Sequence, residues 1–270
     1  MSKHDADLPN GYVTVSTVVM TQGHPLAQQD TVLWEGSLQI VAQGTAVATL
    51  MRTPGHDLEL VHGFLASEGI ATVGGVEVQQ RGPSTIAFVD VPAARFASRG
   101  TVASSACGVC GRSEVADLTR DIPFVKSSRT VSCAQVLAMA PRMAACQPWF
   151  KQTGGAHAAA LFDISGALLV VREDVGRHNA VDKVIGWALQ REIPGADCLL
   201  MVSGRLGFEL VQKAARFGVP WLASVSAPSS LAIEVAQSLG VTACGFVRGE
   251  RLVIYSHPER LSGAAPSPAI

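Results

Sequence analysis

Short apolar runs alternate with segments of helical periodicity through the C-terminal half of the chain. The runs have strand length, and the segments between them carry apolar residues at helical spacing. The predicted strands are 158–162, 167–172, 198–203, 221–225, 242–247 and 252–255. The predicted helices are 175–190, 207–217 and 229–238. This alternation is typical of a layered α/β domain with a largely parallel sheet, whose ligand crevice lies off the carboxyl ends of its strands. The last two strands, joined across Arg248–Glu250, predict an antiparallel edge hairpin.

The N-terminal half has a different pattern, in which strands predominate. Gln43–Thr45 separates two apolar runs and predicts a hairpin turn. Asp57 is placed to begin a helix with apolar residues at helical spacing, and Gly69 is placed to end it. The predicted strands are 38–42, 46–51, 76–78 and 86–91. We therefore predict a smaller, strand-rich α+β subdomain in this half.

These patterns divide the chain into five parts. Small residues and glycines surround two cysteines at 104–112, which predicts an exposed, mobile loop. Helical patterns follow at 114–120 and 134–145, and Pro141 predicts a kink or break in the second. The predicted parts are a flexible tail at 1–12, the N-terminal α+β subdomain at 13–103, the mobile loop at 104–112, the α/β domain at 113–261 and a flexible tail at 262–270.

Composition narrows the possible environments and partners. The chain is 48% hydrophobic and 16% charged, which is typical of a globular protein with a sizeable core. Its formal net charge of −1 gives no reason to expect nucleic acid or an anionic membrane as a partner. No apolar run approaches the about 18 residues of a membrane helix, and Met1–Asn10 has no secretory core. We therefore expect a cytoplasmic protein with reduced thiols.

The sharpest chemical feature is Cys107-Gly-Val-Cys110-Gly111, two thiols within reach of each other in a glycine-rich loop. A helix beginning at Ser113 would favour the reactive thiolate, because the amino end of a helix carries positive charge, and Arg112 adds to this. Such a thiol can accept a sulfane sulfur, and its neighbour can resolve or share the persulfide. The other cysteines are predicted to be buried and inert: Cys133, Cys146, Cys198 and Cys244.

Three other interpretations of the cysteine pair stay open. It could be half of a zinc site, although the chain has no second CxxC or HxxxH pair. It could be a thioredoxin-type redox pair, although no buried strand precedes it. It could also be an inert loop pair.

Further polar clusters are candidate site members. His157 follows two glycines and leads into a strand, but Ala158 and Ala159 come next in place of the glutamate of zinc deaminases, so that chemistry is disfavoured. In the polar stretch 172–183, Asp174 is placed to cap a helix, and His178 and Asp182 lie one turn apart and can pair. A site and a plain capped helix explain this stretch equally well.

Two arginine-containing turns complete the set. Ser203–Arg205 joins a strand to a helix, where backbone N–H groups and a guanidinium can bind phosphate. Phe246–Arg251 offers two arginines and a glycine that can cradle phosphates or stack on a base. From pattern alone, an ordinary turn is the favoured interpretation of each segment.

Together these segments resemble the FdhD/NarQ family of formate dehydrogenase accessory proteins. The matching stretches lie in the family's order and span most of the chain. They are Asp57–Ile70, Cys107–Gly111, Thr153–Ala160, Glu173–Lys183, Ser226–Ala236 and Gly245–Leu261. The most specific pair is CGVCG with EDVGRHNAVDK.

The resemblance implies a function and a site. Family members are sulfurtransferases, which take sulfur from a cysteine desulfurase through a cysteine persulfide. They deliver it to the Mo-bis-molybdopterin guanine dinucleotide cofactor needed by formate dehydrogenase. The persulfide position maps to Cys107, with Cys110 assisting. The cofactor-binding stretch maps to Phe246, Val247, Arg248, Gly249, Glu250 and Arg251, where a guanine nucleotide such as GDP is expected to act as a mimic.

The resemblance also implies a homodimer and a cytidine-deaminase-like, three-layer C-terminal domain without the deaminase metal. The match is inexact at Gly249–Glu250, where an acidic side chain beside phosphates is unexpected. Two alternatives to sulfur transfer remain. One is a non-catalytic chaperone that binds the molybdenum cofactor, and the other is an interaction module bridged by zinc between two subunits.

Overall fold

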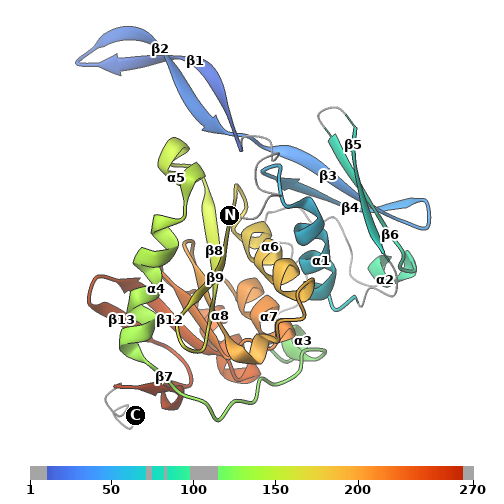
Figure 1. Ribbon diagram of the computed structural model, residues 1–270, viewed down its shortest axis with the longest axis vertical. Helices are drawn as coiled ribbons and strands as arrows, with labels where there is room; N and C mark the ends of the chain where they lie inside the picture. Colours follow the sequence, from blue (N-terminus) through green and yellow to red (C-terminus); the bar gives the residue numbers. More distant parts are fainter. Residues whose placement is uncertain (1–10, 71–74, 82–83, 98–114, 264–270) are drawn as a thin grey trace.

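The computed structural model describes residues 11–70, 75–81, 84–97 and 115–263 (Figure 1). A six-stranded sheet forms the centre of its C-terminal part. The strands are β8 (His157–Asp163), β9 (Leu168–Asp174), β10 (Cys198–Val202), β11 (Trp221–Ser224), β12 (Thr242–Arg248) and β13 (Arg251–Ile254), in the order β13-β12-β11-β10-β8-β9. Neighbouring strands pair in parallel only between β10 and β11 and between β11 and β12, and the other three pairings are antiparallel, so the prediction of a largely parallel sheet was wrong. Residues 164–167 between β8 and β9 are too few for a crossover, so these strands pair as an antiparallel hairpin. The predicted edge hairpin of β12 and β13 is confirmed.

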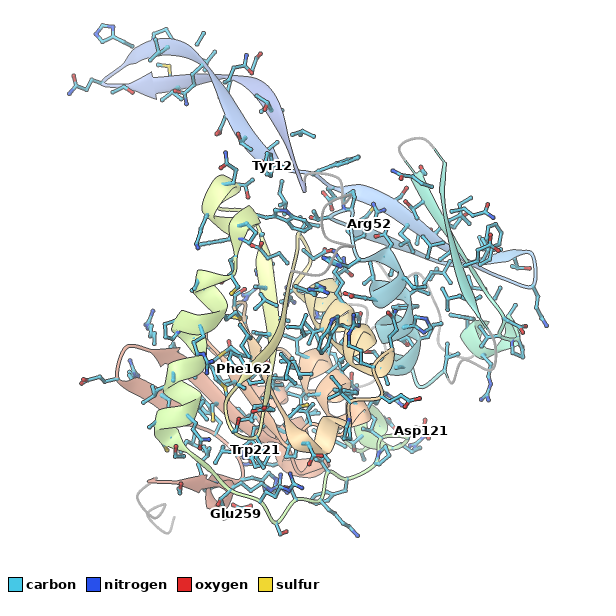
Figure 2. All side chains as sticks on the ribbon, viewed as in Figure 1. Tyr12, Arg52, Asp121, Phe162, Trp221 and Glu259 are labelled. Carbon is cyan, nitrogen blue, oxygen red and sulfur yellow. The ribbon has the colours of Figure 1, made fainter. Side chains whose placement is uncertain are left out.

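Helices cover both faces of this sheet. On one face lie α6 (Arg177–Leu189), α7 (Phe208–Phe217) and α8 (Ser230–Leu239), and α4 (Cys133–Ala145) lies on the other. Neighbouring residues of each strand point to opposite faces. Leu200 therefore packs under α6 and α7, while Phe162 and Trp221 pack on the α4 side (Figure 2). The result is a three-layer α/β arrangement.

The predicted break at Pro141 is absent, because α4 continues across it to Ala145. A proline inside a helix costs roughly 3 kcal/mol. Val136, Met139 and Met143 are buried against the sheet, and burying each such side chain stabilises by about 1.5–3 kcal/mol. Packing therefore outweighs the lost backbone hydrogen bond.

The N-terminal part contains a separate four-stranded sheet. Its strands are β3 (Gly36–Ala42), β4 (Thr45–Arg52), β5 (Val76–Arg81) and β6 (Ser84–Val89), in the order β4-β3-β6-β5, with α1 (Asp57–Ser67) against it and α2 (Ala94–Ala97) after it. Gln43 and Gly44 both have positive φ, 49° and 76°, as a two-residue type I′ hairpin turn requires. The predicted hairpin between β3 and β4 is confirmed.

Two glycines let α1 cross α6 closely and so join the two sheets. A Cβ on Gly63 would lie 2.8 Å from the Cα of Asp182. A Cβ on Gly186 would lie 2.6 Å from the carbonyl carbon of Glu59. Carbon atoms in contact prefer about 3.5–4.0 Å, so only glycine fits at either position.

A hairpin of β1 (Tyr12–Thr21) and β2 (His24–Leu33) projects from the body as an arm, drawn in blue in Figure 1. Gly11 is buried against Trp149, and Tyr12 begins β1, so the last two residues of the predicted tail at 1–12 belong to the fold, while residues 1–10 lie outside the described residues. Val18, Met20 and Leu26 on the arm are more than 60% exposed.

Short elements complete the described chain. They are α3 (Val115–Thr119), β7 (Val131–Ser132), α5 (Pro148–Thr153), two short 3-10 turns at Gly195–Asp197 and Pro258–Arg260, and β14 (Leu261–Ser262). Ser262 pairs with Ser132, so the first residue of the predicted C-terminal tail is part of a strand. None of the helices in the described ranges has the length and apolarity to span a membrane.

Candidate functional site

The carboxyl ends of β10, β11 and β12 are joined into one continuous edge by hydrogen bonds. The Ser224 hydroxyl donates to the Gly204 carbonyl at 2.7 Å and accepts from the Ser226 N–H at 2.9 Å. The Phe246 N–H then donates to the Ser226 carbonyl at 3.0 Å. These bonds place the predicted turns at Ser203–Arg205 and Phe246–Arg251 on the same edge, where α/β sheets bind ligands.

At one end of this edge, a β-bulge turns the Phe246 side chain between two arginines. Phe246 has φ 53°, in the left-handed region, at the register shift between β12 and β13. The Arg248 and Arg251 guanidinium carbons lie 5.8 and 5.2 Å from its ring centroid. A strained aromatic flanked by two planar cations can stack on a flat base and bind phosphate.

The other predicted residues of this hairpin differ in exposure. Val247 is fully buried in the core on the α4 side. Gly249, with φ 57°, and Glu250 are exposed at the turn. A ligand on this hairpin would therefore meet Phe246 and the two arginines, while Val247 holds the strand in place.

At the other end of the edge, His157 from the start of β8 lies against Gly204. A Cβ on Gly204 would be 3.1 Å from His157 Nδ1 and 3.4 Å from the Cβ of Arg177. Burial lowers the pKa of His157, and the neighbouring Arg177 lowers it further, which favours a neutral imidazole. The Nε of Arg177 is buried without a hydrogen-bond partner in the described structure. Arg205, which follows Gly204 in the sequence, is exposed.

His178 faces Glu209 in the first turn of α7. Its Nε2 lies 2.7 Å from Glu209 Oε2, although the ring N–H is not aligned for a standard hydrogen bond. Interaction with His178 lowers the pKa of the Glu209 carboxyl. The predicted pairing of His178 with Asp182 was wrong. Asp182 is instead held by Lys213 at 2.8 Å and by Ser67 at 2.7 Å, so it faces α1 and α7.

Asp174 is buried, and its carboxylate binds several groups of neighbouring elements, but it does not cap the helix. The helix cap is Gly176, two residues later, whose N–H donates to Asp174 Oδ1 at 2.9 Å. The same carboxylate accepts from the Thr53 N–H at 3.2 Å and the Asn179 amide at 2.9 Å, and it pairs with Lys183 at 2.7 Å. Asp174 therefore ties β9 and α6 to the segment after β4.

Other residues of the polar stretch 172–183 also bind neighbouring elements. Arg172 pairs with Glu59 of α1 at 2.6 Å. Glu173 accepts from the Trp149 and Phe150 N–H groups at the start of α5, at 2.9 and 2.8 Å. Most of the stretch thus binds neighbouring elements, while Arg177 and His178 face the sheet edge.

Cys107 and Cys110 lie outside the described residues. Of the described thiols, Cys198 and Cys244 are buried as predicted, and burial raises the pKa of each to about 12. Cys133 is half-buried, and Cys146 is exposed, so the prediction of burial was wrong for Cys146. In the described part of the chain, no group of three or more His, Cys, Asp or Glu residues is placed to hold a metal ion.

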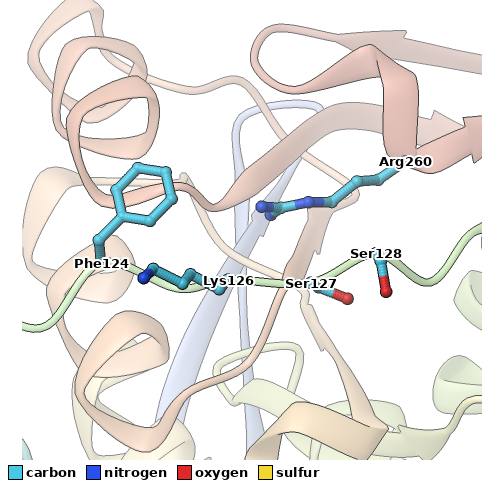
Figure 3. A pocket seen from close by; sticks show the side chains of 5 residues that line it. All are labelled: Phe124, Lys126, Ser127, Ser128 and Arg260. Atoms are coloured by element: carbon cyan, nitrogen blue, oxygen red, sulfur yellow. The ribbon is translucent and has the colours of Figure 1, made fainter.

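A hollow of about 490 Å³ lies at the opposite, amino-terminal edge of the sheet (Figure 3). Its lining residues are Phe124, Lys126, Ser127, Ser128 and Arg260. The Arg260 guanidinium donates to the carbonyls of Val125 and Gly240, and its own carbonyl accepts from the indole of Trp221, the first residue of β11. This hollow is therefore remote from the edge that carries His157 and Phe246.

The fold and the edge define an α/β protein whose candidate ligand site lies at the carboxyl ends of three parallel strands. The model of the FdhD/NarQ family matches residues 33–262, and the chain belongs to this family. A relative named sulfur carrier protein FdhD from Nocardia farcinica is 44% identical over 262 residues, and the match covers 90% of this chain and 92% of the relative's chain. A relative of the same name from Sulfolobus acidocaldarius is 41% identical, covering 88% and 94%.

A solved structure has the same fold. It is a protein from Desulfotalea psychrophila, described provisionally as a formate dehydrogenase accessory protein. Its TM-score to this chain is 0.73 at 25% identity, and the match covers 93% of this chain and 99% of the other.

Sequence reasoning missed three residues of the edge. Ser224 and Ser226 link its loops, and Glu209 holds His178. Ser224 lies near the end of the predicted strand 221–225 and Ser226 follows it, which was an available signal. Glu209 lies in an amphipathic helix, where a charged side chain carries no distinguishing pattern.

Proposed function

We propose that this protein is a sulfurtransferase that carries sulfur from a cysteine desulfurase to the Mo-bis-molybdopterin guanine dinucleotide of formate dehydrogenase. The observation that supports this most is the Cys107-x-x-Cys110 pair in a chain whose relatives, 41–44% identical over most of its length, are named sulfur carriers. A cytoplasmic homodimer with a cytidine-deaminase-like C-terminal domain is part of the proposal.

In the proposed loading step, the Cys107 thiolate attacks the terminal sulfur of the desulfurase persulfide. The S–S bond of the donor breaks, a Cys107 persulfide forms, and the desulfurase cysteine leaves as a thiolate. No net oxidation occurs, because one persulfide is exchanged for another.

In the proposed delivery step, the terminal sulfur leaves Cys107 as sulfide and replaces a ligand on molybdenum. The Cys110 thiolate attacks the inner sulfur of Cys107, so that two electrons pass to the departing sulfur and a Cys107–Cys110 disulfide remains. A thiol reductant then restores both thiols before the next cycle. Cys110 is therefore an assisting residue in this scheme.

The molybdenum cofactor is the cargo, and Phe246–Arg251 is its proposed docking segment. The support is the aromatic ring of Phe246 between the two guanidinium groups, which suits a guanine base and its phosphates. GDP is expected to bind there as a mimic of the guanine nucleotide end.

The test is intact-protein mass spectrometry after incubation with a cysteine desulfurase and cysteine. Wild type should gain the mass of one sulfur, and reductant should remove it. Cys107→Ala should show no gain, while Cys146→Ala is the matched control because Cys146 is an exposed thiol elsewhere on the chain. A wild type that gains nothing while the desulfurase turns over would refute sulfur carriage. It would favour a cofactor-binding chaperone or, if zinc copurifies, a zinc-bridged module.

A further inference from the structure

Beyond its base, the arm of β1 and β2 has no neighbouring layer in the described part of the chain. The arm begins where the Trp34 N–H donates to the Gly11 carbonyl at 2.9 Å, and it then projects away from the body over ten paired rows of residues (Figure 1). An isolated two-stranded hairpin is only marginally stable in water, because no other apolar side chains cover its faces. The arm is therefore expected to be covered by another molecule.

The surface of the arm is apolar and almost free of charge. Asp30 is the only Asp, Glu, Lys or Arg between residues 12 and 33, although 16% of the whole chain is charged. Eleven large apolar residues are exposed in the described ranges, and six of them lie on the arm. These six are Val13, Val15, Val18, Met20, Leu26 and Val32. Such a concentration of exposed apolar side chains with little charge is typical of a surface that becomes the core of a protein–protein interface.

The two faces of the arm differ in the middle of its length. Residues that lie opposite each other in the ladder share a face, and successive residues alternate between the faces. One face, called the valine face, carries apolar side chains from the base of the arm almost to its tip. They are Val13, Val15, Val19, Leu26 and Val32. The other face is polar in its middle, where the Gln29 amide donates to the Ser16 hydroxyl at 3.0 Å and Thr14 lies opposite Thr31. The valine face is therefore the one that requires cover.

We propose that the valine face of each arm packs on the body of a second copy of this chain, so that two copies exchange arms about a two-fold axis. The inference rests on the proposed homodimer, for which it names the interface. Exchange about a two-fold axis is symmetric, because each copy gives one arm and receives one. Asp30 is the one charged residue of the valine face, and its carboxylate already accepts from the Thr31 N–H at 2.8 Å.

The size of the arm favours a second copy over an unrelated protein. At about 3.4 Å per residue along a strand and about 4.8 Å between strands, ten paired rows give a face of roughly 330 Å². Packing this face buries a similar area on the surface that it meets, so one arm accounts for roughly 650 Å², whereas stable interfaces bury about 1,200–2,000 Å². One arm on an unrelated protein falls short of this range. Two exchanged arms bury roughly 1,300 Å², which reaches it.

The experiment is sedimentation equilibrium of the full chain over a series of concentrations. Wild type should have the mass of two chains of 28.2 kDa each. Val15→Lys and Leu26→Lys should each raise the dissociation constant of the dimer roughly a hundredfold, because each buried apolar side chain is worth about tenfold and a symmetric dimer loses it twice. Val18→Lys is the matched control, because it places the same side chain on the other face of β1, and its dissociation constant should stay unchanged. The lysine of Val15→Lys would lie opposite Asp30 in the ladder, so this hairpin should still form.

A shortened arm gives a second test that adds no charge. Deleting residues 17–28 and joining Ser16 to Gln29 through an Asn-Gly turn keeps the rows at the base paired and removes the outer half of the valine face. This variant should be a monomer at concentrations at which wild type is a dimer.

Three results would overturn the exchange of arms: a dimer that persists in the shortened variant, equal weakening by Val15→Lys and Val18→Lys, or a wild type that is a monomer at every concentration. The first two would leave the proposed homodimer standing with a different interface, whereas the third would remove the homodimer as well. Sulfur loading of Cys107 is measured independently by mass, so it decides sulfur carriage whatever the outcome for the arm.

Discussion

Replacing Gly186 with alanine tests whether the close crossing of α1 and α6 holds the two sheets together. By intrinsic propensity alone, alanine in the middle of a helix should stabilise by about 1 kcal/mol relative to glycine. At Gly186 the new methyl group would lie 2.6 Å from the carbonyl carbon of Glu59 and 2.9 Å from the backbone nitrogen of Gly63. Both neighbours are backbone atoms, so no side chain can rotate away.

The nearest atom to the new methyl group is the Glu59 carbonyl oxygen, so the two helices would have to separate by roughly 1.5 Å to restore an ordinary contact. Overpacking of this kind costs about 1–3 kcal/mol, and the upper end applies because backbone must move. Subtracting the propensity gain leaves a net loss of about 2 kcal/mol. For a chain of this size, that corresponds to a fall in melting temperature of roughly 4–8 °C.

Urea unfolding followed by circular dichroism measures this loss directly. Gly75→Ala is the control, because a Cβ there would meet nothing within 4 Å, and its stability should change by less than about 0.5 kcal/mol. The double variant Gly63→Ala, Gly186→Ala should cost less than the sum of the single variants, because one separation of the helices accommodates both methyl groups. A Gly186→Ala protein as stable as wild type would refute the reasoning.

Three further predictions concern charge and exposure. Lys183→Met should leave Asp174 ionised and buried without its cation, at a cost of about 3–5 kcal/mol, and a loss below 1 kcal/mol in urea unfolding would contradict this. The pKa of His56 is lowered from 6.5 to about 3, first by burial and then by Arg172. Between pH 6.5 and about pH 3, His56 is neutral in the folded chain and protonated in the unfolded chain, so unfolding takes up a proton. The free energy of unfolding therefore falls by about 1.4 kcal/mol for each pH unit in this range. Asparagine tolerates the left-handed backbone of His56, so His56→Asn should fold. The free energy of unfolding differs between pH 7.5 and pH 5, and this variant should reduce that difference by about 2 kcal/mol. An unchanged difference would count against a buried neutral His56. Val18→Lys, on the exposed arm, should change the free energy of unfolding by less than about 0.5 kcal/mol, and a larger loss would mean that this side chain is packed in solution.

Local signals in the sequence located most elements correctly. The turn at Gln43–Gly44 was predicted, and the ends of β10 and β12 were predicted to within one residue, because the responsible residues are adjacent in the chain. The direction of the strands was predicted less well. Residues 164–167 are too few for a crossover, so β8 and β9 must pair as a hairpin, and the alternation of strands and helices alone did not reveal this.

The candidate site was predictable only in outline. Phe246–Arg251 was placed on an edge hairpin from its turn residues, but the role of Asp174 depends on Thr53, which lies 121 positions away. The Nε of Arg177 is buried without a hydrogen-bond partner in the described structure. Such an absence appears only when the chain is folded, because any of the acidic residues could have paired with it.

The two strands of the arm leave and rejoin the body at the same point, so the length of the arm can change without disturbing the body. Tyr12 pairs with Leu33, and the Trp34 N–H donates to the Gly11 carbonyl at 2.9 Å, so the chain leaves the body and returns to it at one point. The arm can therefore be shortened or lengthened in steps of paired residues while the register of both larger sheets stays fixed. An engineer can therefore graft a different hairpin onto the same base.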